Sequence, residues 1–200
     1  MPTTVVDPNK IEYGLSSIYF APLEKTTAAN GTVTYTYGTP VALVGAQAMT
    51  REPQGESSSF YADDSVYFTT TTNNGYTGEL TFIKMTDQIR QVIFKEEVDA
   101  TTGLMTERAD VLPAEGALLF QCRGDAKNTR HVMYDVTFGR GSEENNTKED
   151  TITPTTATIT YTAIPIEHNG KQITKGKATE GATCYADFFT SVVLPGTASE

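Results

Sequence analysis

The 200-residue sequence contains no Trp, only two Cys and two His, and fewer basic than acidic residues. Its 15 Lys and Arg against 25 Asp and Glu give a formal net charge of −10. Tight binding of nucleic acid depends on clustered Lys and Arg that neutralise phosphates. The charge therefore argues against nucleic acid as a tightly bound partner.

Residues that usually carry catalysis or hold metals are scarce. Cys122 and Cys184 lie far apart and match no CxxC or zinc spacing, so we expect reduced thiols. His131 and His168 have no His, Cys or carboxylate at ligand spacing. The sequence also lacks the serine nucleophile elbow, the phosphate loop, the dinucleotide fingerprint and the HExxH motif. We therefore expect no enzyme activity, cofactor or metal site.

One carboxylate pair needs separate treatment. Asp63 and Asp64, with Glu56 upstream, offer oxygen atoms that Ca²⁺ accepts. The alternating oxygen ligands and the glycine of a calcium loop are missing, however. Asp is also a common turn residue, so the pair predicts a solvated tight turn.

The first ten residues, MPTTVVDPNK, contain no basic region followed by an apolar core, which a signal peptide would have. No apolar run approaches the roughly 18 residues that a membrane-spanning helix needs. We expect no membrane association, and synthesis and folding in a reducing host cytoplasm.

Ten Tyr, nine Phe and many Thr favour strands, while 16 Gly and nine Pro favour frequent turns. The central stretch has two β-type runs, Ser59–Thr70 and Tyr76–Lys84, separated by the turn-forming Asn73-Asn74-Gly75. A helix is predicted at about residues 86–95, capped by Thr86. Its apolar stripe is formed by Met85, Ile89, Val92 and Ile93.

Further strands are predicted at Ile11–Pro22, Val41–Ala48, Ala117–Arg123, Arg130–Phe138 and Thr155–Ile164. In Arg130–Phe138 we expect the face with Val132 in the core and the face with His131 outside. In Thr155–Ile164 an apolar ladder that includes Ile159 alternates with a Thr ladder. Together these elements predict a mainly β, sandwich-like or barrel-like fold with one flanking α-helix.

The predicted organisation is a single domain over residues 1–200. It has an N-terminal arm at 1–10, a β core at 11–165 and a C-terminal arm at 166–200. A projecting hairpin with an Asn30-Gly31 turn is expected at 25–40, and a hydrophilic loop at 139–150. Tyr185, Phe188, Phe189 and Val192 recur at helical spacing and should dock on the chain's own sheet or on a neighbour. Such appendages suit a subunit that reaches across to its neighbours in a symmetric assembly.

Several segments, in order and spacing, resemble the major tail proteins of long, flexible-tailed bacteriophages. They are GESSSFYADDSVYF followed by NNGYTGEL, KNTRHVMYDVTFGR at 127–140, ITPTTATITYTAIP at 152–165 and YADFFTSVVLP at 185–195. The similarity runs over nearly the whole chain, and none of these segments is catalytic.

The resemblance implies a tail-tube fold and a structural subunit of the virion that forms stacked hexameric rings. Double-stranded DNA would pass through the lumen without tight binding, and an acidic lumen would repel it. Implied partners are further copies of the chain and the tape-measure, tail-tip and tail-terminator proteins. Candidate lumen-facing acids are Glu56, Asp63, Asp64 and Glu79. Candidate contacts between subunits are Asn30, Val33, Tyr35, Tyr37, Arg140, Glu143, Glu144, Tyr185, Phe188, Phe189 and Leu194.

Two other function classes stay open at this point. A carbohydrate-binding or adhesin-like β-sandwich of a virion would use exposed tyrosines to stack on sugars. It predicts a stable monomer with sugar affinity. A hydrolase would need polar residues converging in a pocket, and the sequence offers no such set.

Overall fold

The computed structural model describes residues 13–29, 31, 33–144 and 156–196. The predicted N-terminal arm at 1–10 and residues 145–150 of the predicted loop at 139–150 lie outside the described residues. Strands make up 52% and helices 5%, in one large antiparallel sheet with one helix, which confirms the predicted mainly β class.

Eleven strands form the main sheet, and its central order is β2-β1-β11-β12-β14-β8-β4. Four strands pair beside this path: β3 with β1, β5 with β8, β13 with β14 and β17 with β12. The bounds along the path are Val33–Tyr37 (β2), Leu15–Thr27 (β1), Glu115–Cys122 (β11), Arg130–Phe138 (β12), Ala157–Ile164 (β14), Gly75–Phe82 (β8) and Ala46–Met49 (β4). The other four are Val41–Ala42 (β3), Glu52–Gln54 (β5), Ser142–Glu143 (β13) and Lys175–Ala178 (β17).

The short segment 41–49 joins the two ends of this sheet. Its first part, β3, pairs with β1, and its second part, β4, pairs with β8. Between them, the Leu43 N–H donates to the Ile18 carbonyl at 2.8 Å, and the Gly45 carbonyl accepts from the Ile83 N–H at 2.9 Å. The sheet therefore curls, so that the segment 41–49 bridges β1 and β8, which are far apart in the strand order.

A first hydrophobic cluster fills the interior of the joined sheet. Strands β1, β8, β11, β12 and β14 contribute its buried side chains, among them Phe20, Leu80, Phe82, Leu118, Phe138, Ile159 and Tyr161. The predicted helix covers one end of it as α1 (Asp87–Ile89) continued by the π-helical turn η1 (Arg90–Phe94). Thr86 Oγ1 accepts from the Ile89 N–H at 3.3 Å, which confirms the predicted cap. Met85, Ile89 and Ile93 are buried in this cluster, as the apolar stripe predicted.

A second cluster packs on the opposite face of β1, β11 and β12, and includes Leu119, Val132, Tyr134, Ile166 and Phe188. The prediction that only one face of Arg130–Phe138 enters the core is therefore wrong. Met133 belongs to the first cluster and Val132 to the second, so both faces are covered. From Met133 to Val136, β12 advances three residues while β11 advances two, from Leu118 to Gly116. This bulge shifts the alternation of side chains, which the sequence pattern did not reveal.

The strand β14 follows its sequence pattern closely. Ala157, Ile159, Tyr161 and Ala163 are buried, as the apolar ladder predicted. On the threonine face, the Thr158 and Thr81 hydroxyls lie 3.2 Å apart across the β14–β8 pair. The apolar ladder of β14 therefore packs in the core, whereas its threonine ladder is more exposed to solvent.

The predicted C-terminal arm begins later than residue 166. Residues 166–178 form β15 (Ile166–His168), β16 (Lys171–Ile173) and β17, and β17 pairs with β12 inside the main sheet. The following segment, 179–196, consists of turns and bends, although its aromatic residues recur at helical spacing. It packs on the second cluster through Phe188, which is 3% exposed. Of the two expected docking partners, the structure shows the chain's own sheet.

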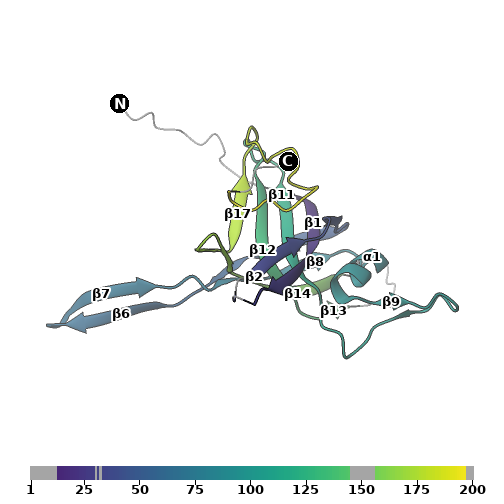
Figure 1. Ribbon diagram of the computed structural model, residues 1–200, viewed down its shortest axis with the longest axis horizontal. Helices are drawn as coiled ribbons and strands as arrows, with labels where there is room; N and C mark the ends of the chain where they lie inside the picture. Colours follow the sequence, from purple (N-terminus) through teal and green to yellow (C-terminus); the bar gives the residue numbers. More distant parts are fainter. Residues whose placement is uncertain (1–12, 30, 32, 145–155, 197–200) are drawn as a thin grey trace, which may run out of the picture.

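The predicted long strand Ser59–Thr70 is instead a hairpin of β6 (Ser57–Ala62) and β7 (Ser65–Thr71). Figure 1 shows this hairpin extending away from the rest of the molecule. The tight turn expected at Asp63 and Asp64 divides the run, because both residues lie between β6 and β7 rather than inside one continuous strand. On the other side of the body, the charged segment after the helix forms a small pair, β9 (Glu97–Val98) and β10 (Met105–Thr106) (Figure 1).

Candidate assembly surfaces

The β6–β7 hairpin has no other part of the described chain packed on it. Every residue of β6 is exposed, and so is every residue of β7 except Thr70, which is half-buried. Asp63 and Asp64 occupy the left-handed region with φ of 51° and 58°, which turns the chain tightly at the tip. This confirms the turn expected for the pair.

Large apolar side chains cluster near the tip of the hairpin. Phe60 and Phe68 face each other across the pair with ring centroids 6.2 Å apart. Tyr61 pairs with Val66 beyond a shift in register, and Tyr67 is 81% exposed. Contiguous exposed apolar surface marks an interaction site far more often than isolated exposed residues do. The outer edges of β6 and β7 also carry backbone N–H and C=O groups that a further strand could pair with.

The four candidate lumen-facing acids lie on different elements. Asp63 and Asp64 lie at the hairpin tip, whereas Glu56 lies at its base, where its carbonyl accepts from the Thr72 N–H at 3.0 Å. Glu79 lies on β8 in the main sheet, with its N–H bonded to Thr50 Oγ1 at 2.9 Å. The structure therefore does not bring the four into one cluster. Among the described residues, no group of three or more His, Cys, Asp or Glu is arranged to hold a metal ion.

The predicted hairpin at 25–40 is present but belongs to the sheet rather than projecting from it. Its turn residue Asn30 lies outside the described residues, and Val33 at the start of β2 is exposed. Tyr35 and Tyr37 pack against the second cluster. The Tyr37 hydroxyl also donates to the Tyr134 carbonyl at 3.1 Å. Both tyrosines thus make contacts within the subunit.

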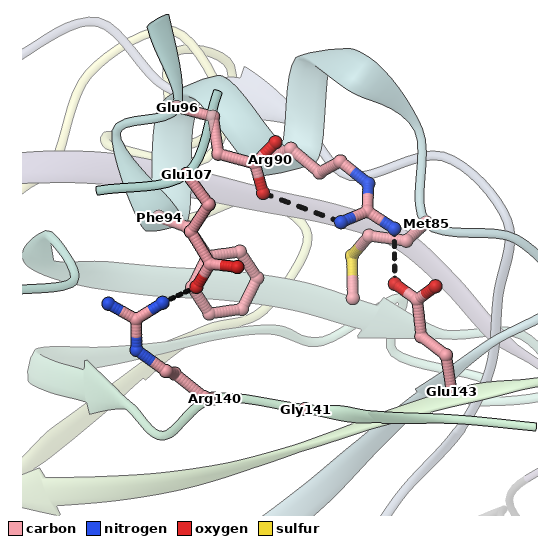
Figure 2. Close-up of a pocket in the computed structure, with 8 residues that line it drawn as sticks. All are labelled: Met85, Arg90, Phe94, Glu96, Glu107, Arg140, Gly141 and Glu143. Atoms are coloured by element: carbon pink, nitrogen blue, oxygen red, sulfur yellow. Dashed lines mark hydrogen bonds and ion pairs between the residues drawn. The ribbon is translucent and has the colours of Figure 1, made fainter. Parts of the chain in front are cut away.

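Two more of the candidate contact residues, Arg140 and Glu143, line a cavity of about 400 Å³ beside the helix, which Figure 2 shows. Arg90 forms ion pairs with Glu96, at 3.4 Å, and with Glu143. Arg140 forms an ion pair with Glu107 and donates to the carbonyls of Arg108 and Val111. Glu144 continues from β13, with its N–H 3.4 Å from the Thr156 carbonyl.

These ion pairs have a structural role inside the chain. They fasten the helix and the 95–114 segment to β13 and the residues before it (Figure 2). The guanidinium groups face carboxylates, so the cavity presents compensated charge rather than a free anion-binding site. Arg140 and Glu143 were predicted as contacts between subunits, whereas here both form ion pairs within the chain. Arg90 and Glu107 were not predicted, because their partners Glu143 and Arg140 are distant in sequence.

The tail residues Tyr185, Phe189 and Leu194 lie against the second cluster. Arg130 holds the tail: its guanidinium carbon lies 3.9 Å from the Tyr185 ring centroid and 4.6 Å from that of Phe189. It also donates to the Tyr185 carbonyl. Phe189 stacks on Tyr19 with centroids 4.8 Å apart. Cation–π contacts and aromatic stacking thus fix a segment that has no regular structure.

His131 is half-buried rather than outward-facing, which corrects the prediction. Its ring stacks on Phe120 with centroids 5.0 Å apart. Burial, together with the nearby charges of Arg51 and Lys177, lowers the pKa of His131 to about 4. His131 lies opposite Phe120 because of the register between β11 and β12, and the sequence of β12 alone does not reveal that register. His168 lies elsewhere and donates to the Pro195 carbonyl at 2.9 Å.

No protein-family model matches this sequence, and no curated protein matches it. Within the part of the chain that the structure covers, no helix has the length and apolar character needed to cross a bilayer.

Proposed function

We propose that this chain is a structural subunit that assembles with copies of itself into the stacked rings of a phage-type tail tube. The observation that carries the proposal is the β6–β7 hairpin, which exposes five large apolar residues outside both hydrophobic clusters. An isolated two-stranded hairpin is marginally stable in water. Packing against a neighbouring subunit would bury these residues and pair the hairpin edges.

The net negative charge of each chain opposes such an assembly. A ring of six subunits would carry about sixty negative charges, six times the charge of one chain. Apolar burial and pairing between subunits must offset this repulsion. The same charge suits a conduit for DNA, since an acidic wall does not bind phosphates. On this proposal the chain resides in the virion, with the tape-measure, tail-tip and tail-terminator proteins as neighbours.

The test is electron microscopy and size-exclusion chromatography of the concentrated protein. We expect rings or hollow tubes from the native chain. A variant with Tyr61→Thr and Tyr67→Thr should stay monomeric at the same concentration, because Thr keeps strand propensity but removes the apolar surface. The matched control carries Val44→Thr and Leu112→Thr, which remove exposed apolar groups away from the hairpin. A native protein that stays monomeric with and without a tail-tip complex would contradict the proposal.

The alternative of a carbohydrate-binding module has one supporting observation, the exposure of Tyr61 and Tyr67. Sugar-binding sites are concave, however, whereas these rings stand on a projecting hairpin. A glycan array separates the two functions. Sugar binding by a stable monomer that Tyr67→Thr abolishes would favour the alternative.

A further inference from the structure

Three exposed cations gather on one face of the molecule, and we define Arg51, Lys175 and Lys177 as the basic patch. Lys177 lies opposite His131, and Lys175 opposite Met133, in the β17–β12 pair, so the two lysines share a face. Arg51 reaches the same place from the segment before β5, with its guanidinium carbon 4.8 Å from the Phe120 ring centroid.

The basic patch is not neutralised within the described part of the chain. No described carboxylate lies within ion-pair distance of its three cations. Asp125 is the acid whose charge acts to raise the pKa of the neighbouring His131. The Asp125 carboxylate accepts from the backbone N–H groups of Lys127 and Thr129, at 2.9 and 2.7 Å. Such a concentration of positive charge is unexpected on a chain with a net charge of −10.

The hairpin tip has the opposite character. Asp63 and Asp64 form the turn, Glu56 lies at the base, and no Lys or Arg occurs between Arg51 and Lys84. Asp63 and Asp64 connect β6 to β7, and this end of the hairpin is far from the body in Figure 1. A partner that receives this tip should therefore offer positive charge beside apolar or aromatic surface.

We propose that the basic patch is the docking site for the acidic tip of the β6–β7 hairpin of a second copy of this chain. The inference rests on the proposed function and names the surface that receives the hairpin. Lys175 already lies over the Tyr76 ring, with Nζ 4.5 Å from its centroid, so aromatic surface adjoins the charge. The hairpin leads away from its own body, which leaves the patch to a neighbour's tip.

The arrangement determines the kind of assembly that results. Tip and patch are different surfaces of one chain, so a single tip–patch contact is heterologous. A heterologous contact repeats from copy to copy and closes into a ring or continues as a helix. A dimer that closes on itself would leave one tip and one patch unused unless both pairs formed together.

Charge reversal of the patch tests the proposal. The variant K175E/K177E should raise the protein concentration needed for assembly by about tenfold or more, since like charges then meet at the contact. The matched control K84E/K171E makes the same change in net charge at exposed lysines outside the patch. Light scattering at low and high salt gives a second readout. Salt should weaken assembly of the native chain, and it should reduce the like-charge repulsion that opposes assembly of the variant.

A compensating change at the tip makes the test specific. Adding A62K/D63N/D64N/S65K to K175E/K177E inverts both partners, and Asn tolerates the left-handed turn. Restored assembly supports the contact. If K175E/K177E assembles like the native chain, the docking site is overturned while the tube proposal stands. If the native chain never assembles, both fail. Duplex DNA binding that requires Lys175 and Lys177 would overturn docking of a second copy by identifying nucleic acid as the occupant.

Discussion

The Lys25 ammonium lies 2.8 Å from Oδ2 of Asp135 and ties β1 to β12 at the bulge between the two hydrophobic clusters. Asp135 is 2% exposed, and its Oδ1 has no hydrogen-bond partner among the described residues. Lys25 also reaches Glu115, at 2.7 Å, on the exposed side. Burial raises the pKa of Asp135, and the Lys25 charge opposes that rise.

Lys25→Met should lower the free energy of unfolding at pH 7 by about 3 kcal/mol, because it leaves a buried carboxylate unpaired. Glu115→Gln, which removes the exposed partner, should cost less than about 1 kcal/mol. Since Asp135 titrates at a higher pH in the folded state, its protonation relieves the defect as pH falls. Urea titrations at pH 4 and pH 7 should show a smaller loss at pH 4. Equal losses at both pH values would contradict the role of Asp135.

His131 predicts a loss of stability in acid. Its pKa in the folded chain is about 4, below its ordinary value of 6.5, so the unfolded chain binds the proton more readily. The contribution of the neutral His131 ring to the free energy of unfolding is therefore fully present above pH 6.5, and it declines as pH falls toward 4. His131→Phe keeps a ring against Phe120 but cannot titrate. The difference in unfolding free energy between the two proteins should therefore change across this window, and a constant difference would refute the prediction.

Phe188 and Phe68 form a matched pair of one buried and one exposed aromatic, at 3% and 56% exposure. Phe188→Ala should cost about 3 to 4 kcal/mol, because it opens a cavity under the tail. Phe68→Ala should change the stability of the monomer by less than about 0.5 kcal/mol. Thermal unfolding measures both. A small effect of Phe188→Ala would mean that the tail contributes little to the second cluster.

Gly75 should resist substitution at the start of β8. Its φ is 117°, and a Cβ there would lie 2.0 Å from the Ala163 carbonyl oxygen. Gly75→Ala should therefore cost about 3 kcal/mol or more through a forced shift of the β8–β14 pair. Gly103→Ala is the control, since φ there is 71° with no atom within 4 Å of the added Cβ. It should cost only the backbone strain, about 1 kcal/mol. Similar losses for the two would remove the steric explanation.

Local patterns in the sequence predicted the elements that depend on local physics. The Thr86 cap, the Ile89 stripe and the alternating strand around Ile159 all follow from period and capping, and the structure contains them. The 25–40 hairpin was also found, although its strands lie within the sheet.

Features that depend on pairing over long distances could not be predicted. The bulge in β12 arises from its register with β11, so nothing in the alternation of Arg130–Phe138 announces it. Lys175 and Lys177 fell in the predicted C-terminal arm, because only their pairing with β12 places them beside Arg51. A turn at Asp63 and Asp64 was predicted, but the pairing of the residues on either side into a separate hairpin was not, because β-type residues flank the turn and resemble one run.

The pairing of β1 with β11 also sets the order of events as the chain folds. Leu15 meets Cys122 in this pair, so the sheet cannot form until more than half of the chain is available. Such non-local sheets fold in about milliseconds to seconds, whereas a hairpin such as β6–β7 forms in about 1 to 10 μs. The hairpin can therefore form before the body that positions it, and newly made chains pass through an interval in which its apolar side chains are exposed and the main sheet is still incomplete.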